Sequence, residues 1–73
     1  MPIIDMVATG NNIKTMRKTF GISVADIQDA CGISAAAVSK WQKGQSMPTI
    51  DNLVILASIF GVKIDEIVIC KTI

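Results

Sequence analysis

The chain has 73 residues and 51% of them are hydrophobic, so it is long enough for one domain with a core and too apolar to be disordered. Its net charge of +1 is too small to indicate nucleic-acid binding by itself. An argument for nucleic-acid binding must therefore depend on where the basic residues lie. The chain has no histidine and only two cysteines, which excludes a disulfide framework and argues strongly against a zinc site.

The first predicted helix runs from about residue 10 to residue 20. Thr9 precedes it, and its side chain is of a type that caps the free amides of a helix start. Apolar residues recur along this segment at intervals of three and four and form one stripe: Ile13, Met16 and Phe20. Gly21 suits the left-handed position that ends a helix.

The second predicted helix begins after Ser23, with Asp26 three residues on as in an acidic variant of the capping box. Gly32 ends it. We expect three of its residues to face inward: Ile27, Ala30 and Cys31.

The third predicted helix begins after Ser34 and runs to about Lys43, where Gly44 closes it. Val38 and Trp41 lie three residues apart and form its inward pair. Trp41 is therefore expected in the core and not as a platform for stacking bases.

A fourth helix is predicted after Pro48, with Thr49 as its N-cap and Gly61 at its end. It carries the widest apolar face of the chain: Ile50, Leu53, Val54, Leu56, Ala57 and Phe60. A short fifth helix is expected near residues 64–68, although Lys63 is a poor N-cap.

Both ends of the chain are rich in β-branched residues and are of strand length, over residues 2–6 and 67–73. One interpretation is a small two-stranded ribbon, which needs support because an isolated hairpin is marginal. The other is a pair of frayed tails. The sequence leaves both open.

Residues 23–41 contain a helix, a turn opened by a glycine and a second capped helix, which is the spacing of a helix-turn-helix. In DNA-binding versions the second helix enters the major groove. From about residue 10 to residue 68 the chain resembles the Xre/Cro-repressor family. The residues that carry the resemblance are Ile13, Arg17, Gly21-Ile22-Ser23, Gly32-Ile33-Ser34, Val38-Ser39-Lys40-Trp41-Gln42-Lys43-Gly44, Pro48, Asp51-Asn52-Leu53, Leu56-Ala57, Phe60-Gly61-Val62 and Asp65-Glu66-Ile67.

The resemblance implies an all-α, compact, five-helix domain that binds operator DNA, forms dimers and regulates transcription. It implies base-edge contacts from Ala35, Ala36, Ser39 and Lys40. It also implies phosphate contacts from Ser23, from the amides of Val24 and its neighbours at the start of the second helix, and from Lys43, Gly44, Gln45 and Ser46. A helix start suits a phosphate because its free amides and dipole favour an anion.

The chain departs from the family pattern at several positions. The second helix opens with Val24 where glutamine is frequent, and Gln28 replaces a small residue. Gln42 stands where an acid often pairs with Arg17, which still allows a hydrogen bond. The base-contacting face holds Ala35, Ala36 and Ala37, which offer methyl groups for thymine but no hydrogen bonds. Base discrimination then depends on Ser39, Lys40 and DNA shape.

The leading hypothesis is a sequence-specific regulator of transcription, a repressor that occupies an operator in double-stranded DNA as a homodimer. The alternative is a protein-interaction or antitoxin-like module that has lost base recognition. The tails or the segment Ile67-Val68-Ile69 would form the dimer interface. Without an activated nucleophile or an acid pair we expect no enzyme and no cofactor. Because a chain of 73 residues leaves no room for a ligand-sensing domain, we expect no small-molecule ligand.

No apolar run reaches the about 18 residues of a membrane span, and no signal segment starts the chain. We therefore expect no membrane partner and a cytoplasmic location. All 73 residues are expected to form one domain, 1–73.

Overall fold

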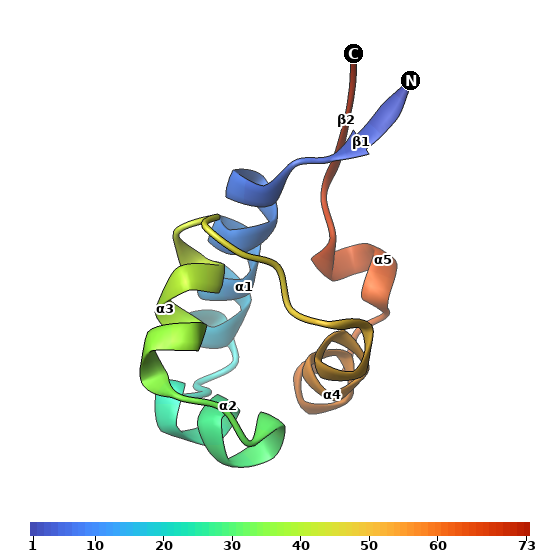
Figure 1. Ribbon diagram of the computed structural model, residues 1–73. Helices are drawn as coiled ribbons and strands as arrows, with labels where there is room; N and C mark the ends of the chain where they lie inside the picture. Colours follow the sequence, from blue (N-terminus) through green and yellow to red (C-terminus); the bar gives the residue numbers. More distant parts are fainter.

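Five helices and a two-stranded ribbon make up the fold in the computed structural model, which describes residues 1–73 (Figure 1). In chain order these are β1 (Pro2–Ile4), α1 (Met6–Thr19), α2 (Val24–Cys31), α3 (Ala35–Gln42), α4 (Ile50–Phe60), α5 (Ile64–Ile67) and β2 (Cys70–Thr72). Figure 1 shows α1, α2 and α3 on one side, α4 and α5 on the other, and both chain ends in the ribbon. The predicted five-helix class is confirmed. No helix has the length and hydrophobicity needed to span a membrane.

The first helix is longer than the sequence predicted. It begins at Met6, and its N-cap is Asp5, whose Oδ1 accepts a hydrogen bond from the Ala8 amide at 3.0 Å. The prediction of a start near Gly10 with Thr9 as N-cap is therefore wrong. Asp5 is an equally good capping residue, and the Thr9 side chain is buried and bound to a distant part of the chain. The predicted end is confirmed, since Gly21 has φ +68°.

The other helices begin where their capping residues predict. Ser23, Ser34 and Thr49 each accept a hydrogen bond from the amide three residues on, at 3.0, 3.2 and 3.2 Å. The short α5 lacks such a side chain at Lys63, and the Lys63 amide instead donates to Glu66 Oε1 at 3.2 Å. These contacts are local, which is why short sequence motifs predict them.

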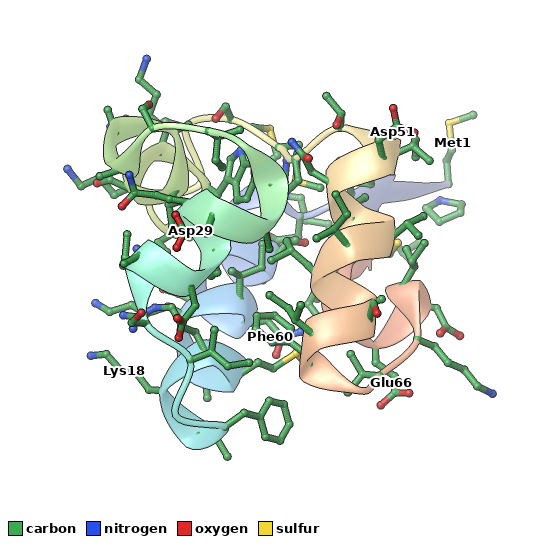
Figure 2. The ribbon with its side chains drawn as sticks, turned by 90° about the horizontal axis from the view of Figure 1, so that it is seen from below. Met1, Lys18, Asp29, Asp51, Phe60 and Glu66 are labelled. Atoms are coloured by element: carbon green, nitrogen blue, oxygen red, sulfur yellow. The ribbon has the colours of Figure 1, made fainter.

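Nine buried hydrophobic residues form one core shared by α1 to α5: Ile13, Ile27, Val38, Trp41, Leu53, Leu56, Ala57, Phe60 and Ile67. Figure 2 shows Phe60 directed from α4 into the middle of the molecule, whereas Lys18 lies at its edge.

Four residues of the predicted apolar faces are exposed. Phe20, at the end of α1, is 48% exposed. In α2 only Ile27 is buried, and Ala30 lies on the exposed side of the helix. In α4, Ile50 and Val54 lie four residues apart and are 71% and 52% exposed.

The chain ends pair as an antiparallel ribbon, in which Pro2 lies opposite Thr72, Ile3 opposite Lys71 and Ile4 opposite Cys70. The ribbon interpretation is therefore confirmed, and frayed tails are excluded. Its support comes from α1, because the Thr9 hydroxyl accepts a hydrogen bond from the Ile69 amide at 2.9 Å.

The end of α5 is held in the same way. The side-chain amide of Asn12 in α1 donates to the carbonyl oxygens of Glu66 and Ile67, at 2.8 and 3.0 Å. Ile67 is fully buried, which rules out the predicted role of its side chain in a dimer interface. Ile67 serves the core of its own chain.

Candidate nucleic-acid interface

The α2–turn–α3 unit is held in shape at each of its junctions. At the start of α2 the Ser23 hydroxyl accepts from the Asp26 amide, and Asp26 Oδ2 accepts from the Ser23 amide at 2.9 Å. Gly32 ends α2 in the left-handed region, with φ +66° and its amide bound to the Gln28 carbonyl. Ser34 then caps α3. Helix, turn and helix therefore have the order and caps that the sequence predicts.

Helix α3 presents two different faces. Val38 is fully buried and Trp41 is 5% exposed, which confirms that Trp41 is a core residue. The opposite face carries four residues predicted to meet base edges: Ala35, Ala36 and Lys40, which are exposed, and Ser39, which is half-buried. The structure thus brings these four side chains onto one side of α3.

The chemistry of this face is mostly apolar. Ala35 and Ala36 present only methyl groups, and the nearby Ser34 hydroxyl is already used as the cap of α3, accepting from the Ala37 amide. Hydrogen bonds to bases can come only from Ser39 and Lys40 on this face. Methyl groups of this kind are suited to the thymine methyl group in the major groove, and a lysine is suited to donate to guanine.

The start of α2 is the first predicted phosphate site. Ser23 is exposed, while Val24 is half-buried with its side chain against the core, so Val24 can offer only its amide. The capping box uses the amides of Ser23 and Asp26. The capping box also puts the exposed carboxylate of Asp26 at this helix start. The pKa of Asp26 is lowered, first by the hydrogen bond from the Ser23 backbone and then by the hydrogen bond with the Ser23 side chain. A phosphate would share this helix start with a negative charge.

The segment after α3 is the second predicted phosphate site. Three of its amides are already bound to α3 carbonyls: Lys43 to Ser39 at 3.0 Å, Gly44 to Trp41 at 3.1 Å and Gln45 to Lys40 at 2.9 Å. Gly44 has φ +73°, and a Cβ there would lie 2.7 Å from the Cα of Val7. Gly44 therefore shapes the loop, and the groups left for a phosphate are mainly the side chains of Lys43, Gln45 and Ser46.

Comparison with known proteins agrees with this geometry. A model of the helix-turn-helix family HTH_3 matches residues 13–67. The chain belongs to this family. Membership of this family, together with its repressor relatives, identifies the chain as a DNA-binding regulator of transcription.

One curated relative is the cryptic phage CTXphi transcriptional repressor RstR of Vibrio cholerae, with 33% identity over 55 residues. The match covers 75% of this chain and 49% of RstR, so the chain spans about half the length of this relative.

Solved structures share the fold of this HTH_3 domain. The P22 c2 repressor in complex with a synthetic operator is 27% identical with a TM-score of 0.73, covering 81% of this chain and 89% of that one. A transcriptional regulator from Listeria innocua is 27% identical with a TM-score of 0.76, covering 82% and 56%. The restriction-modification controller C.AhdI from Aeromonas hydrophila, at 22% identity, has a TM-score of 0.76 and covers 86% and 96%.

In this HTH_3 domain Arg17 belongs to the scaffold of the interface. Its Nε donates to Gln42 Oε1 at 3.2 Å, and its Nη1 donates to the Ile22 carbonyl oxygen at 3.2 Å. The predicted hydrogen bond between Arg17 and Gln42 is confirmed. Through it, the end of α3 is tied to α1 and to the segment before α2.

Gly10 lies inside α1 and is buried, a position that was not predicted to be important. A Cβ there would meet the backbone of α3 and the loop after it, with 2.9 Å to the Gln42 carbonyl oxygen. A glycine in the middle of a helical pattern is the signal that could have revealed this close approach.

Proposed function

We propose that the chain is a sequence-specific repressor that occupies an operator in double-stranded DNA. The observation that carries this proposal is the exposed side of α3, where four side chains face outward while Val38 and Trp41 anchor the helix in the core. The phage repressor RstR and the operator complex of the P22 c2 repressor support it. A chromosomal or phage DNA target puts the protein in the cytoplasm.

In this proposal α3 lies in the major groove with its N-terminal half against the bases. Ala35 and Ala36 contact thymine methyl groups, Lys40 donates to guanine, and Ser39 donates to or accepts from a neighbouring base. Because only two of the four side chains form hydrogen bonds, the shape of the DNA contributes to the choice of site.

Phosphate contacts hold the helix in this position. We assign them to Ser23 and the Val24 amide at the start of α2, and to the loop that follows α3. In that loop Lys43 supplies the charge, Gln45 and Ser46 supply neutral donors, and Gly44 allows the loop to lie close to α1.

The repressor acts as a homodimer in this proposal. One α3 helix makes few base contacts, and a second copy doubles them on an inverted repeat whose half-sites lie about 10 base pairs apart. Two linked sites also raise the effective affinity without any new kind of contact.

A second function is favoured by the alanine face itself. A helix-turn-helix with three alanines at the start of α3 has lost most of the donors that bases require, which fits a protein-interaction or antitoxin-like module. The exposed Lys40 and Lys43 count against it, because a protein partner gives no general reason to keep them on this surface.

Selection from a pool of random duplexes, followed by affinity measurements on the enriched sequence, tests the proposal. Lys40→Ala should weaken binding by about 1–3 kcal/mol and relax the preference at one position, whereas Lys43→Ala should weaken all sequences equally and reduce the salt slope by about 1. Lys63→Ala is the matched control, since Lys63 is exposed and lies beside α5, across the molecule from α3.

The outcomes separate the two functions. An enriched inverted repeat whose binding depends on Lys40 supports the repressor. A pool that binds without enrichment, or Lys40 and Lys43 variants that bind like Lys63→Ala, refutes base recognition by α3. If no duplex binds at all, the protein-interaction function takes first place.

A further inference from the structure

The two outer edges of the terminal ribbon differ. The backbone amide of Asp5 donates to the Ile69 carbonyl oxygen at 2.8 Å, and the backbone amide of Ile73 donates to the Met1 carbonyl oxygen at 3.0 Å. In an antiparallel pair the residues that exchange hydrogen bonds alternate with those whose backbone groups point outward. With the observed register, the outward residues are therefore Pro2 and Ile4 on β1, and Cys70 and Thr72 on β2.

Only one of these edges is fit to accept another strand. On β1 the outward position Pro2 has no N–H to donate, which blunts the edge. On β2 both outward residues keep an N–H and a carbonyl, and all three residues of the strand are exposed. An exposed edge of this kind is a template for pairing with another chain.

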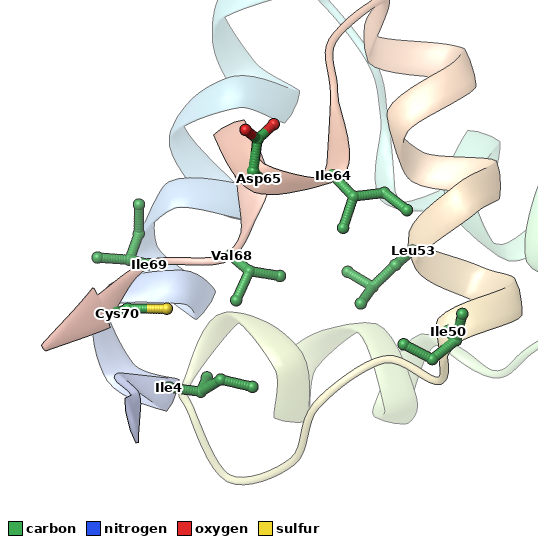
Figure 3. A pocket seen from close by; sticks show the side chains of 8 residues that line it. All are labelled: Ile4, Ile50, Leu53, Ile64, Asp65, Val68, Ile69 and Cys70. Carbon is green, nitrogen blue, oxygen red and sulfur yellow. The ribbon is translucent and has the colours of Figure 1, made fainter. Parts of the chain in front are cut away.

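An apolar groove lies beside this open edge. It has a volume of about 690 Å³, and seven of the eight residues that line it are hydrophobic. Figure 3 shows Ile4, Leu53 and Val68 converging on it from β1, α4 and the end of α5, with Asp65 at its margin. Ile50, which is 71% exposed, extends the groove along α4. This groove is therefore an apolar surface that lies next to an unpaired strand edge.

We propose that a second copy of this chain pairs with β2, antiparallel and centred on Cys70, and that the grooves of the two copies join. The inference rests on the two-copy operator binding proposed above and assigns its interface. Symmetry identifies the partner as a second copy of this chain. The open edge of β2 can pair antiparallel with the same edge of another copy, and a two-fold dimer formed in this way leaves neither β2 edge unpaired.

Charge decides between the registers centred on the neighbouring residues Cys70 and Lys71. Pairing centred on Lys71 would place its ammonium group directly opposite that of the second copy, which is unfavourable. Pairing centred on Cys70 sets Cys70 against Cys70 of the second copy and Lys71 against Ile69. The register centred on Cys70 therefore avoids like charges and forms two symmetric backbone hydrogen bonds at its centre.

The same register explains the groove. A two-fold axis perpendicular to the sheet keeps equivalent side chains on one face of the resulting four-stranded sheet. Cys70 and its cross-strand neighbour Ile4 both line the groove, so both grooves lie under that face and meet at the axis. Their apolar walls then cover one another, and no charged group except Asp65 lies along them.

Sedimentation equilibrium on the full chain gives the first test. The variant designed to disrupt the dimer is Cys70→Pro, at the centre of the proposed pairing. The wild type should be a dimer at micromolar concentration. Cys70→Pro removes the outward N–H at the axis but leaves the internal ladder of the ribbon intact, and should raise the dimer dissociation constant about tenfold or more. Cys70→Ser keeps the N–H and is the matched control.

A second variant keeps the test valid if the proline disturbs folding. Ile50→Lys puts a charge into the joined groove at a residue that is already 71% exposed, and should weaken the dimer by about tenfold or more. Val7→Lys is its control, since Val7 is 59% exposed on α1 and does not line the groove. Wild type that stays monomeric, or a dimer that neither Cys70→Pro nor Ile50→Lys weakens, overturns the proposal.

Cross-linking tests the register. A hydrogen-bonded antiparallel pair has its Cα atoms about 5.5 Å apart, within the range of about 4.4–6.8 Å that a disulfide needs. In a Cys31→Ser background, diamide should therefore link two chains through Cys70, taking up two electrons and two protons from the two thiols. Dimers that do not cross-link contradict the Cys70 register. If the protein is a monomer in solution but still binds an inverted repeat, the proposed interface is wrong and the repressor proposal stands. If it forms the cross-linked dimer but has no affinity for DNA, the repressor proposal is wrong and the interface stands.

Discussion

Gly10 in α1 lies against the carbonyl oxygen of Trp41 near the end of α3, with no room for a side chain between them. A Cβ on Gly10 would overlap the Trp41 oxygen and lie 2.9 Å from that of Gln42 and 3.0 Å from the Gly44 amide nitrogen. All three are backbone atoms, which cannot turn aside as a flexible side chain does. This glycine therefore sets the distance between α1 and the helix that is proposed to contact DNA.

Gly10→Ala should lower the free energy of unfolding by about 3 kcal/mol or more, because α1 and α3 must separate to admit the methyl group. Urea unfolding measures this change. Gly21→Ala is the matched control. Gly21 has φ +68° and no atom within 4 Å of a Cβ, so only backbone strain of about 1–2 kcal/mol applies. Equal losses for the two variants would show that the close approach of α1 and α3 is not tight.

Thr9→Val tests the anchor of the ribbon. The side chain of Thr9 is fully buried and accepts the Ile69 amide at 2.9 Å. Valine keeps the shape but leaves that amide without a partner, which should lower the free energy of unfolding by about 1–3 kcal/mol and speed hydrogen exchange at Ile69. Thr15→Val, at an exposed position of the same helix, should change neither. Unchanged exchange at Ile69 in Thr9→Val would contradict the role of this hydroxyl.

Gln42→Glu should stabilise the fold. Arg17 already donates to the Gln42 side-chain oxygen at 3.2 Å, and both residues are half-buried, so a carboxylate converts a neutral acceptor into a charged one. We expect a gain of about 0.5–1 kcal/mol at neutral pH and low salt. The gain should shrink in high salt and below about pH 4, where the glutamate is protonated.

Gln45→Glu controls for the added charge, because Gln45 is exposed. A gain of the same size in Gln45→Glu would attribute the effect to overall charge and not to the contact with Arg17.

The elements that the sequence predicted well are those held by nearby residues. Ser23 with Asp26 and the turn at Gly32 act within four residues, so the motif alone fixes where α2 begins and ends. The errors came from contacts between distant segments. Thr9 looks like a cap, yet its partner Ile69 lies 60 residues away. The candidate interface shows the same contrast between what was predictable and what was not. The exposed face of α3 was predictable, whereas the hydrogen bonds that use the amides of residues 43–45 after α3 were not.

The same division explains why the ribbon stayed undecided. Three-residue strands have no local signal strong enough to exclude frayed tails. Their register depends on α1, in which Asn12 holds the end of α5 and Thr9 holds Ile69 just after it. Only the folded chain brings these groups together.

Acid should weaken the cap of α2. The pKa of Asp26 is lowered, first by the hydrogen bond from the Ser23 backbone and then by that from its side chain. Because the folded chain favours the ionised carboxylate, its contribution is present above the unfolded pKa of about 3.9 and is lost as the pH falls through the lower, folded value. Asp26→Asn should therefore be less stable than the wild type at pH 7, and the difference should close in acid.

Urea unfolding at several pH values measures this difference. Asp29→Asn is the control, since Asp29 is an exposed acid within α2 and takes no part in the capping box. A difference between wild type and Asp26→Asn that stays constant down to strong acid would contradict the role of the ionised carboxylate.

The methyl groups of Ala35 and Ala36 make a prediction about the DNA itself. Replacing one thymine of the selected half-site by deoxyuridine removes only a methyl group and leaves every hydrogen-bonding group of the base in place. At a thymine that meets one of these alanines, affinity should fall by about 0.8 kcal/mol, or roughly fourfold. Other thymines should show no change, which makes them internal controls within the same duplex.

Glycine substitutions then assign the contact to a residue. In Ala36→Gly the protein methyl group is missing, so the thymine that it meets should become insensitive to deoxyuridine while a thymine that meets Ala35 stays sensitive. The double-mutant cycle removes the general cost of glycine in a helix, because that cost is the same on both duplexes. If no thymine responds, or if the response survives both Ala35→Gly and Ala36→Gly, the apolar side of α3 does not contact thymine methyl groups and the choice of site depends on Ser39, Lys40 and DNA shape alone.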